Sequence, residues 1–384
     1  MKKYFLLLLV VCLMCGCGKK AADSGFETVV YDENSKSDFL GSGLVSEIEI
    51  IPLETTAGSL IGEEPRVAVA GSGFYVTVPW GGESVLRFDP KGKFLNTIGR
   101  KGGGPNEYNS IYDIEIDDDS GTLHIYSGSN KAEYLYSLTG EFKGRNEMTY
   151  LNDRAISTPD GHWLYLGYAN GLLPYRLVFT DKEDNVAEEF LPADFNVLPM
   201  REFSAPVFSR NRDKIYARTT FDNHILEIGR DRSVDTLYGF DFGRYNIPQK
   251  YFEFDDARAA GIFLLEESDF GVIWDFMCND DYAVAITGVQ NAASGERMVS
   301  YGIKDRKSDS GWHWVHFDPD PQVMVANIFS GLQAMTENSE LIILVEAHRL
   351  LGFGQLDSKL FKNPEILGTV AEDSNPVILK CKLK

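Results

Sequence analysis

The stretch Phe88-Asp89-Pro90-Lys91-Gly92-Lys93-Phe94 decides the fold, because the chain returns to this pattern at regular intervals. It recurs as Leu138-Thr139-Gly140-Glu141-Phe142, at a glycine-to-glycine spacing of 48 residues. Looser copies follow at residues 181–186 and 229–234. Each copy is a polar turn between two apolar segments, and a fixed period of this length indicates a repeat fold. We interpret the copies as the hairpin between the third and fourth strands of successive β-propeller blades.

The rest of the chain has the composition of an all-β protein. From residue 46 onward, short runs of Val, Ile, Tyr, Phe and Thr alternate with clusters of Gly, Asp, Asn and Pro, which is the pattern of strands and turns. Helical periodicity is nearly absent, which argues against Rossmann and TIM-barrel folds. We predict blade one from strands at 66–70, 74–78, 84–88 and 94–98, then blades over 111–145, 150–195, 205–243 and 272–317, and a last blade with strands at 332–336, 341–346 and 377–383.

The last blade is one strand short, and a spare strand at residues 47–53 precedes blade one. Pairing that strand with the C-terminal strand closes the ring and removes two unpaired sheet edges, which β proteins avoid. The prediction is therefore an all-β, six-bladed β-propeller over residues 46–384, closed by its two terminal strands. Two stretches, 244–270 and 347–375, interrupt the repeat, and each is long enough for a short helix.

The N-terminus has the features of an export signal. Lys2 and Lys3 precede an apolar run over residues 4–14, which is too short to span a bilayer. Cys17 follows Gly16, as in a bacterial lipobox, so we expect a signal peptide at 1–16 and lipidation of Cys17 by diacylglycerol and palmitate. Residues 17–45 would then be the lipidated cysteine and a flexible tether. The alternative is ordinary secretion, with Cys17 removed.

Charge and cysteine content exclude other classes. The 37 basic and 57 acidic residues give a net charge of −20, which disfavours nucleic acid as a partner. Of the five cysteines, only Cys278 and Cys381 belong to the predicted propeller, and their strand-like surroundings indicate unpaired, buried thiols. We expect a monomer whose one membrane contact is the N-terminal lipid.

Residues 98–108, Ile-Gly-Arg-Lys-Gly-Gly-Gly-Pro-Asn-Glu-Tyr, resemble a hallmark of the six-bladed β-propeller lipoproteins abundant in Bacteroidetes, which are related to NHL-repeat propellers. Residues 52–62, 241–248 and 375–384 also resemble members of that family, and the resemblance covers residues 46–384. It implies an outer-membrane lipoprotein. Members exported to the surface carry acidic residues after the cysteine, so Lys19 and Lys20 indicate a periplasm-facing anchor.

The glycine-rich loop has two interpretations. In the structural one, Gly102, Gly103, Gly104 and Pro105 form a sharp turn between blades one and two, and Glu107 and Tyr108 hold it by hydrogen bonds. In the functional one, Arg100, Lys101 and Tyr108 contact a ligand at the mouth of the central channel. A phosphate-binding P-loop is excluded because no Lys-Ser/Thr and no helix follow the glycines.

No other motif indicates a catalytic centre. His313 and His316 lie three apart on a predicted strand and so point to opposite faces, which is a poor geometry for a metal. The acidic residues 113–119 are expected to form a solvated hairpin turn rather than a Ca²⁺ site. The five tryptophans are expected to pack between blades, although they could stack on sugars.

The sequence therefore favours a non-catalytic propeller that binds a glycan, peptide or protein at its channel face, with no cofactor. The alternative is a metal-dependent hydrolase or lyase with its site in the central channel, because paired carboxylates cannot be located from sequence.

Overall fold

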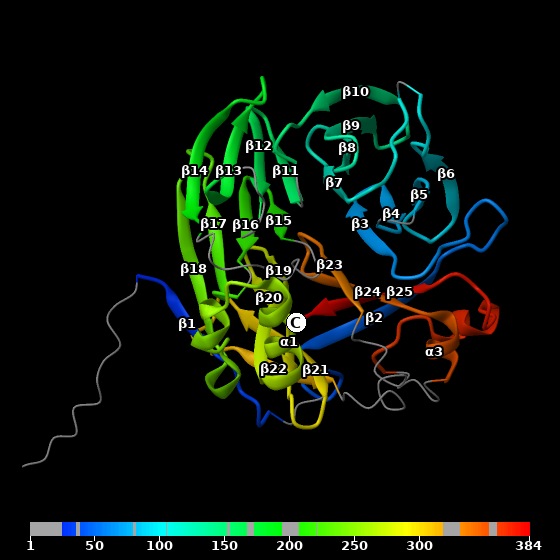
Figure 1. The fold of residues 1–384 in the computed structure, drawn as a ribbon. Helices are drawn as coiled ribbons and strands as arrows, with labels where there is room; N and C mark the ends of the chain where they lie inside the picture. Colours follow the sequence, from blue (N-terminus) through cyan, green and yellow to red (C-terminus); the bar gives the residue numbers. More distant parts are fainter. Residues whose placement is uncertain are drawn as a thin grey trace, which may run out of the picture.

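The computed structural model describes residues 25–35, 39–79, 82–104, 106–151, 154–166, 173–193, 207–219, 221–317, 331–352 and 359–384, and Figure 1 shows their strands as small sheets around a ring. Over these residues there are six sheets, five with four strands and one with five. The predicted all-β, six-bladed architecture is confirmed.

Blades one to three follow the chain in simple up-and-down order. Their strands are β3 (Arg66–Ala70), β4 (Gly73–Thr77), β5 (Val85–Phe88) and β6 (Phe94–Ile98); β7 (Asp113–Asp117), β8 (Thr122–Ser127), β9 (Ala132–Ser137) and β10 (Phe142–Glu147); and β11 (Arg154–Thr158), β12 (Gly161–Tyr165), β13 (Tyr175–Asp181) and β14 (Val186–Pro192).

In blades four and five the four consecutive strands have the same order, with the first of them innermost. Their strands are β15 (Phe208–Asn211), β16 (Lys214–Arg218), β17 (His224–Ile228) and β18 (Val234–Asp241), then β19 (Phe270–Cys278), β20 (Tyr282–Gln290), β21 (Arg297–Asp305) and β22 (His313–Phe317).

Blade six is assembled from both parts of the chain, as predicted. Its order is β2-β25-β24-β23, so β2 (Val45–Pro52) is the outer strand and pairs antiparallel with β25 (Val377–Leu383). The inner pair consists of β23 (Leu332–Met335) and β24 (Glu340–Val345). Figure 1 shows the blue β2 beside the red β25, so the ring is closed by strands from opposite ends of the sequence.

The N-terminal segment departs from the prediction of a flexible tether over 17–45. Residues 27–30 form β1 (Glu27–Val30), which pairs in parallel with β18 as a fifth strand of blade four. Val29, Tyr31 and Phe39 are buried, and Trp314 donates from Nε1 to the Val30 carbonyl at 3.1 Å. The tether prediction is therefore wrong for these residues, because buried side chains fix them along the outer rim.

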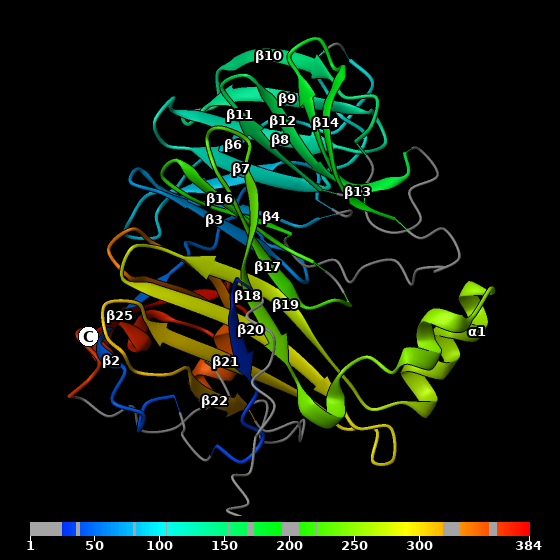
Figure 2. The same ribbon diagram turned by 90° about the vertical axis from the view of Figure 1, so that its left-hand side faces the viewer.

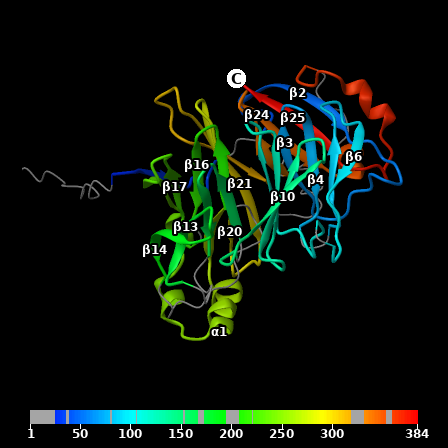
Figure 3. The same ribbon diagram turned by 90° about the horizontal axis from the view of Figure 1, so that it is seen from above.

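The two predicted insertions contain short helices. The first holds η1 (Gly243–Tyr245), η2 (Gln249–Glu253), α1 (Ala257–Ile262) and η3 (Phe263–Glu267), and Figures 2 and 3 show α1 standing away from the sheets. The second holds α3 (Ala347–Gly352) and η5 (Pro364–Thr369). None of the described helices is long and apolar enough to cross a bilayer.

The hydrophobic core is divided among the seams between blades. One buried cluster joins blades one and two through Tyr75, Ile98 and Leu123, and another joins blades six and one through Ile51, Val76 and Ile378. The remaining four seams have clusters of the same kind. Each blade is therefore stabilised in large part by packing against its two neighbours.

Candidate functional site

A cavity of about 980 Å³ lies along the axis of the ring. All six inner strands line it: β3, β7, β11, β15, β19 and β23, the strands that surround the middle of the ring in Figure 1. Its volume is at the upper end of the range for small-molecule sites. The cavity is therefore the first place to look for a function.

Charged residues gather at one end of this cavity. Arg66, Asp113 and Arg154 are the first residues of inner strands β3, β7 and β11. Arg218 is the last residue of β16, which runs antiparallel to inner strand β15, so it lies at the same end. With Asp275 of β19, these residues form what we call the arginine cluster.

Arg154, Arg218 and Asp275 of the arginine cluster are buried, whereas Arg66 and Asp113 are partly exposed, and the members are electrostatically coupled. Arg154 is 2% exposed and Arg218 is 3% exposed, and Arg154 Nε lies 3.3 Å from Asp113 Oδ2. Burial lowers the pKa of the Arg66 guanidinium; Arg154 and Arg218 add to that effect, while Asp113 and Asp275 oppose it. Arg66, Asp113 and Asp275 line the cavity itself.

A β-bulge presents Asp275 to the cavity. The register between β19 and β20 shifts between Ile273 and Asp275, so Trp274 and Asp275 both line the cavity instead of alternating between faces. Trp274 fits because its indole packs against Gly288 on the neighbouring strand β20, where a Cβ would come within 2.3 Å of the ring. Burial raises the pKa of Asp275 to about 7, although the charges of Arg66 and Arg218 oppose the shift. Bulges and shifted carboxyls of this kind are common at functional sites.

A second ionic group lies farther along the cavity wall. Arg210 of β15 donates to Glu115 of β7 from Nε at 3.0 Å and from Nη2 at 2.6 Å. The other carboxylate oxygen of Glu115 accepts from the Tyr126 hydroxyl at 2.7 Å and from the Ser157 backbone N–H at 2.9 Å. Both carboxylate oxygens of Glu115 therefore accept hydrogen bonds. This group links blades two, three and four and has a structural role.

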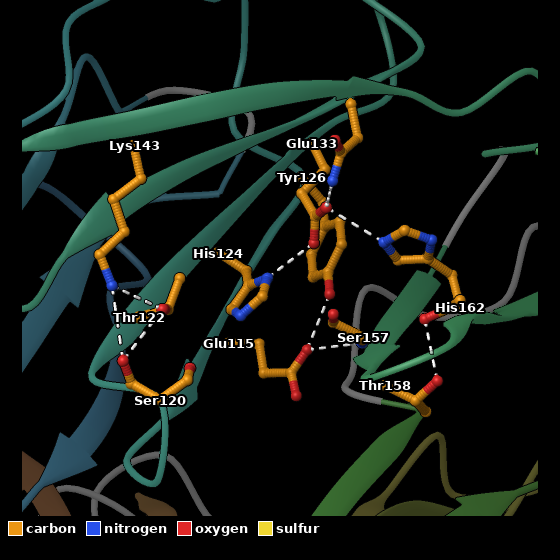
Figure 4. Close-up of polar contacts among 12 residues, drawn as sticks. Glu115, Ser120, Thr122, His124, Tyr126, Glu133, Lys143, Ser157, Thr158 and His162 are labelled. Atoms are coloured by element: carbon orange, nitrogen blue, oxygen red, sulfur yellow. Dashed lines mark hydrogen bonds and ion pairs between the residues drawn. The ribbon is translucent and has the colours of Figure 1, made fainter. Parts of the chain in front are cut away.

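Behind it, Glu133 is held between two histidines, as Figure 4 shows. Its carboxylate lies 2.6 Å from His124 Nδ1 and 3.0 Å from His162 Nε2, and it accepts from Asn146 Nδ2 at 2.7 Å. Burial raises the pKa of Glu133, but hydrogen bonds from both imidazoles outweigh it and hold the pKa far below its ordinary value. We call these four residues the Glu133 network; it joins blade two to blade three.

The glycine-rich loop lies outside the cavity, since none of its described residues contributes to the lining. Glu107 accepts from Arg100 Nε and from the Gly104 backbone N–H, both at 2.8 Å. A Cβ on Gly102 would lie 2.0 Å from Glu107 Oε2, so a larger residue there would displace the carboxylate that accepts from Arg100 and Gly104. The structure therefore favours the structural interpretation of this loop. Pro105 lies outside the described residues.

Two expectations for this loop need correction. Tyr108 is fully buried, so it cannot contact a ligand in this conformation, and among the described residues its hydroxyl has no hydrogen-bond partner. Its backbone does hold the loop by hydrogen bonds, as predicted: the Gly102 N–H donates to the Tyr108 carbonyl at 3.0 Å, and the Tyr108 N–H donates to the Arg100 carbonyl at 3.3 Å. The positive backbone φ lies at Gly99 and not in the glycine triplet. Ligand contact by Arg100 and Lys101 stays a prediction. Arg100 pairs with Glu107, Lys101 is exposed, and neither residue lines the cavity.

Replacing Gly99 with alanine is expected to destabilise the protein by about 2–4 kcal/mol. Gly99 has a φ of +71°, and a Cβ there would lie 2.7 Å from the Tyr108 hydroxyl oxygen, inside a packed seam. Urea unfolding measures the effect. Gly103→Ala is the matched control, because a Cβ at Gly103 meets nothing within 4 Å. Equal losses in the two variants would contradict the assigned role of Gly99.

The other sequence-derived candidates are structural where they are described. His316 lies 2.7 Å from Ser300 Oγ, and Asp117 Oδ1 accepts from the backbone N–H of Asp119 at 3.1 Å in a turn. Cys278 and Cys381 are buried and unpaired, as predicted. No three His, Cys, Asp or Glu side chains converge as a metal site would require, within the described ranges. Cys17 and Trp80 lie outside those ranges.

The arginine cluster was not found from the sequence. Its members are distant in the chain, and only the ring geometry brings them together. The sequence did contain one signal. The first residue of the inner strand is charged in three blades: Arg66 in β3, Asp113 in β7 and Arg154 in β11.

A closed ring of six small sheets around an axial cavity defines a six-bladed β-propeller. The chain belongs to the DUF4934 family, described as a domain of unknown function, which it matches over residues 27–382.

Solved structures agree on the fold. A Bacteroides fragilis protein with the provisional description of an exported protein superposes with a TM-score of 0.73 at 15% identity, covering 93% of this chain and 99% of its own. A DUF4221 family member from Bacteroides vulgatus has a TM-score of 0.54 at 11% identity, covering 88% and 97%. No curated protein matches this chain.

Proposed function

We propose that this protein is an outer-membrane lipoprotein, anchored through Cys17 and facing the periplasm, whose propeller binds a glycan, a peptide or a segment of a partner protein in its central cavity without catalysis. The observation that carries the proposal is the cavity of about 980 Å³ lined by all six inner strands. Export and anchoring are supported by the lipobox-like N-terminus and by the likeness to a Bacteroides fragilis protein described as exported.

The test is a binding screen with the full chain in detergent, using neutral and charged oligosaccharides and short peptides, read by calorimetry. A ligand is expected that binds the wild-type chain but not Ala68→Phe, because Ala68 lines the cavity and a phenyl ring would occupy it. Ala371→Phe is the matched control at an exposed position, and it should bind normally. Binding that survives Ala68→Phe, or chemical turnover of the ligand, contradicts the proposal.

A second candidate function, acid–base catalysis, is favoured by one observation. Burial raises the pKa of Asp275 to about 7, and this carboxyl lines the cavity within electrostatic reach of Arg66 and Arg218, which suits a general acid or base acting on an anionic substrate. Turnover that disappears in Asp275→Asn would support it. The metal-dependent alternative has no convergent ligand set among the described residues, and metal analysis of chelator-free protein is its test.

A further inference from the structure

Asp275 is a buried carboxyl whose hydrogen-bonding capacity the fold uses only in part. It is 9% exposed, and its Oδ1 accepts from the Phe276 backbone N–H at 2.7 Å. Over the described residues, the side chain makes no other hydrogen bond, so Oδ2 has no donor from the protein. A buried polar atom without a partner is costly, and such atoms are rare in native proteins. Since Asp275 lines the cavity, a ligand there can supply the donor.

The indole of Trp274 joins this carboxyl on the cavity wall. The bulge in β19 brings both side chains to the cavity, and the indole rests against Gly288 of β20. Trp274 is partly exposed, and its Nε1–H makes no hydrogen bond within the part of the chain that the structure describes. The bulge therefore offers an aromatic ring, an N–H donor and a carboxyl oxygen to the same ligand.

The charges around Asp275 favour a neutral ligand group. Arg66 of β3 and Arg218 of β16 act on the carboxyl, and Asp113 of β7 opposes them. Charges of both signs therefore act at this point, so either a cation or an anion would meet a like charge. A hydroxyl meets none, and it can donate to the ionised carboxyl or accept from the protonated one. Both forms occur near neutral pH, because burial raises the pKa of Asp275 to about 7.

We propose that the cavity binds a neutral saccharide, with hydroxyls hydrogen-bonded to Asp275 Oδ2 and Trp274 Nε1 and with one sugar ring packed on the indole. A sugar ring suits this pair of side chains, because it has C–H groups on its faces and hydroxyls around its edge. Much of the remaining lining is apolar, as is typical of ligand cavities. This inference rests on the proposed binding function and specifies the class of its ligand.

The experiment is a titration of the full chain in detergent with four neutral disaccharides: maltose, cellobiose, lactose and N,N′-diacetylchitobiose. Calorimetry and tryptophan fluorescence measure binding, and at least one disaccharide is expected to bind. Asp275→Leu should weaken that binding at least about tenfold, because leucine has a similar volume but no hydrogen-bonding group. Asp119→Leu is the matched control. Asp119 lines the same cavity from an exposed turn, so this variant should bind as the wild type does.

Substitutions of Trp274 test where the sugar ring lies. Trp274→Leu should weaken binding at least about fivefold, whereas Trp274→Phe keeps an aromatic ring and should retain most of the affinity. The fluorescence change on binding should disappear in Trp274→Phe, although calorimetry still detects the ligand. If Asp275→Leu does not fold, the two Trp274 variants still decide.

The outcomes separate this inference from the proposed function. No disaccharide binding to the wild-type chain, or equal binding by wild type, Asp275→Leu and Trp274→Leu, overturns the inference. A peptide that binds the wild-type chain but not Ala68→Phe, where no disaccharide binds, overturns the inference and leaves the proposed function intact. Disaccharide binding that survives Ala68→Phe contradicts both. Binding of tetramethylammonium or sulfate in place of the disaccharides would show a site for a charged ligand and would also overturn the inference.

Discussion

Deleting residues 377–383 is expected to abolish the single cooperative unfolding transition of this protein. The segment is β25, which lies between β2 and β24, so its loss opens the ring and leaves two unpaired sheet edges. It also removes Val377, Ile378, Leu379 and Leu383, all at most 4% exposed. Burial of each is worth about 1.5–3 kcal/mol, and together they are comparable with the whole stability of an ordinary domain, about 5–15 kcal/mol.

Thermal and urea unfolding followed by circular dichroism measure this effect. The matched control is deletion of residues 27–30, because β1 is a peripheral fifth strand of blade four and the ring stays closed without it. That variant should retain one sharp transition at a lower midpoint. A 377–383 deletion that melts like the parent would show that the terminal strands do not close the ring.

The fold could be predicted where its signals are local. Strands 66–70, 94–98 and 377–383 match the prediction to the residue, because Gly, Pro or polar residues border these apolar runs. The pairing of β2 with β25 was predicted from the number of strands, because the last blade lacked one strand and one unassigned strand preceded blade one. β1 was missed because its four residues are mostly exposed and its partner β18 lies about two hundred residues away.

The site could not be predicted in the same way. The glycine-rich loop attracted attention through its local composition, but composition does not show that Tyr108 is buried or that Glu107 already holds Arg100. The arginine cluster has no local motif: its charges come from separate blades, and the exposure of Asp275 to the cavity depends on a one-residue bulge. Periodicity places side chains on faces, whereas a convergent site depends on how distant strands are arranged around the axis.

Replacing Glu133 with alanine is expected to lower the free energy of unfolding by about 3–5 kcal/mol. Glu133 is 1% exposed and accepts hydrogen bonds from His124 and Asn146 of its own blade and from His162 across the seam to blade three. Its removal leaves these donors buried without their acceptor and opens a cavity. Urea unfolding at pH 6, below the raised pKa of His124, measures the largest effect.

The pH dependence gives a second measure of the same network. Burial lowers the pKa of His124, but the hydrogen bond to Glu133 and the charges of Glu115, Glu133 and Asp117 outweigh it, so the pKa is raised. A raised folded-state pKa stabilises the fold below the unfolded value of about 6.5, and this contribution is lost as the pH rises through the folded-state pKa. In Glu133→Gln, the pKa of His124 measured by NMR should fall, and this contribution should diminish.

Glu147→Ala is the control for Glu133→Ala, because Glu147 also pairs with a basic residue, Arg145, but its side chain is 68% exposed. Water and salt screen such a pair, so its loss should cost at most about 1 kcal/mol. The comparison isolates burial, since both variants remove one carboxylate from blade two. Two results would contradict the role of the Glu133 network: similar losses of stability in Glu133→Ala and Glu147→Ala, or an unchanged, raised pKa of His124 in Glu133→Gln. In that case blades two and three would be joined by the apolar packing around Tyr126 and Leu164.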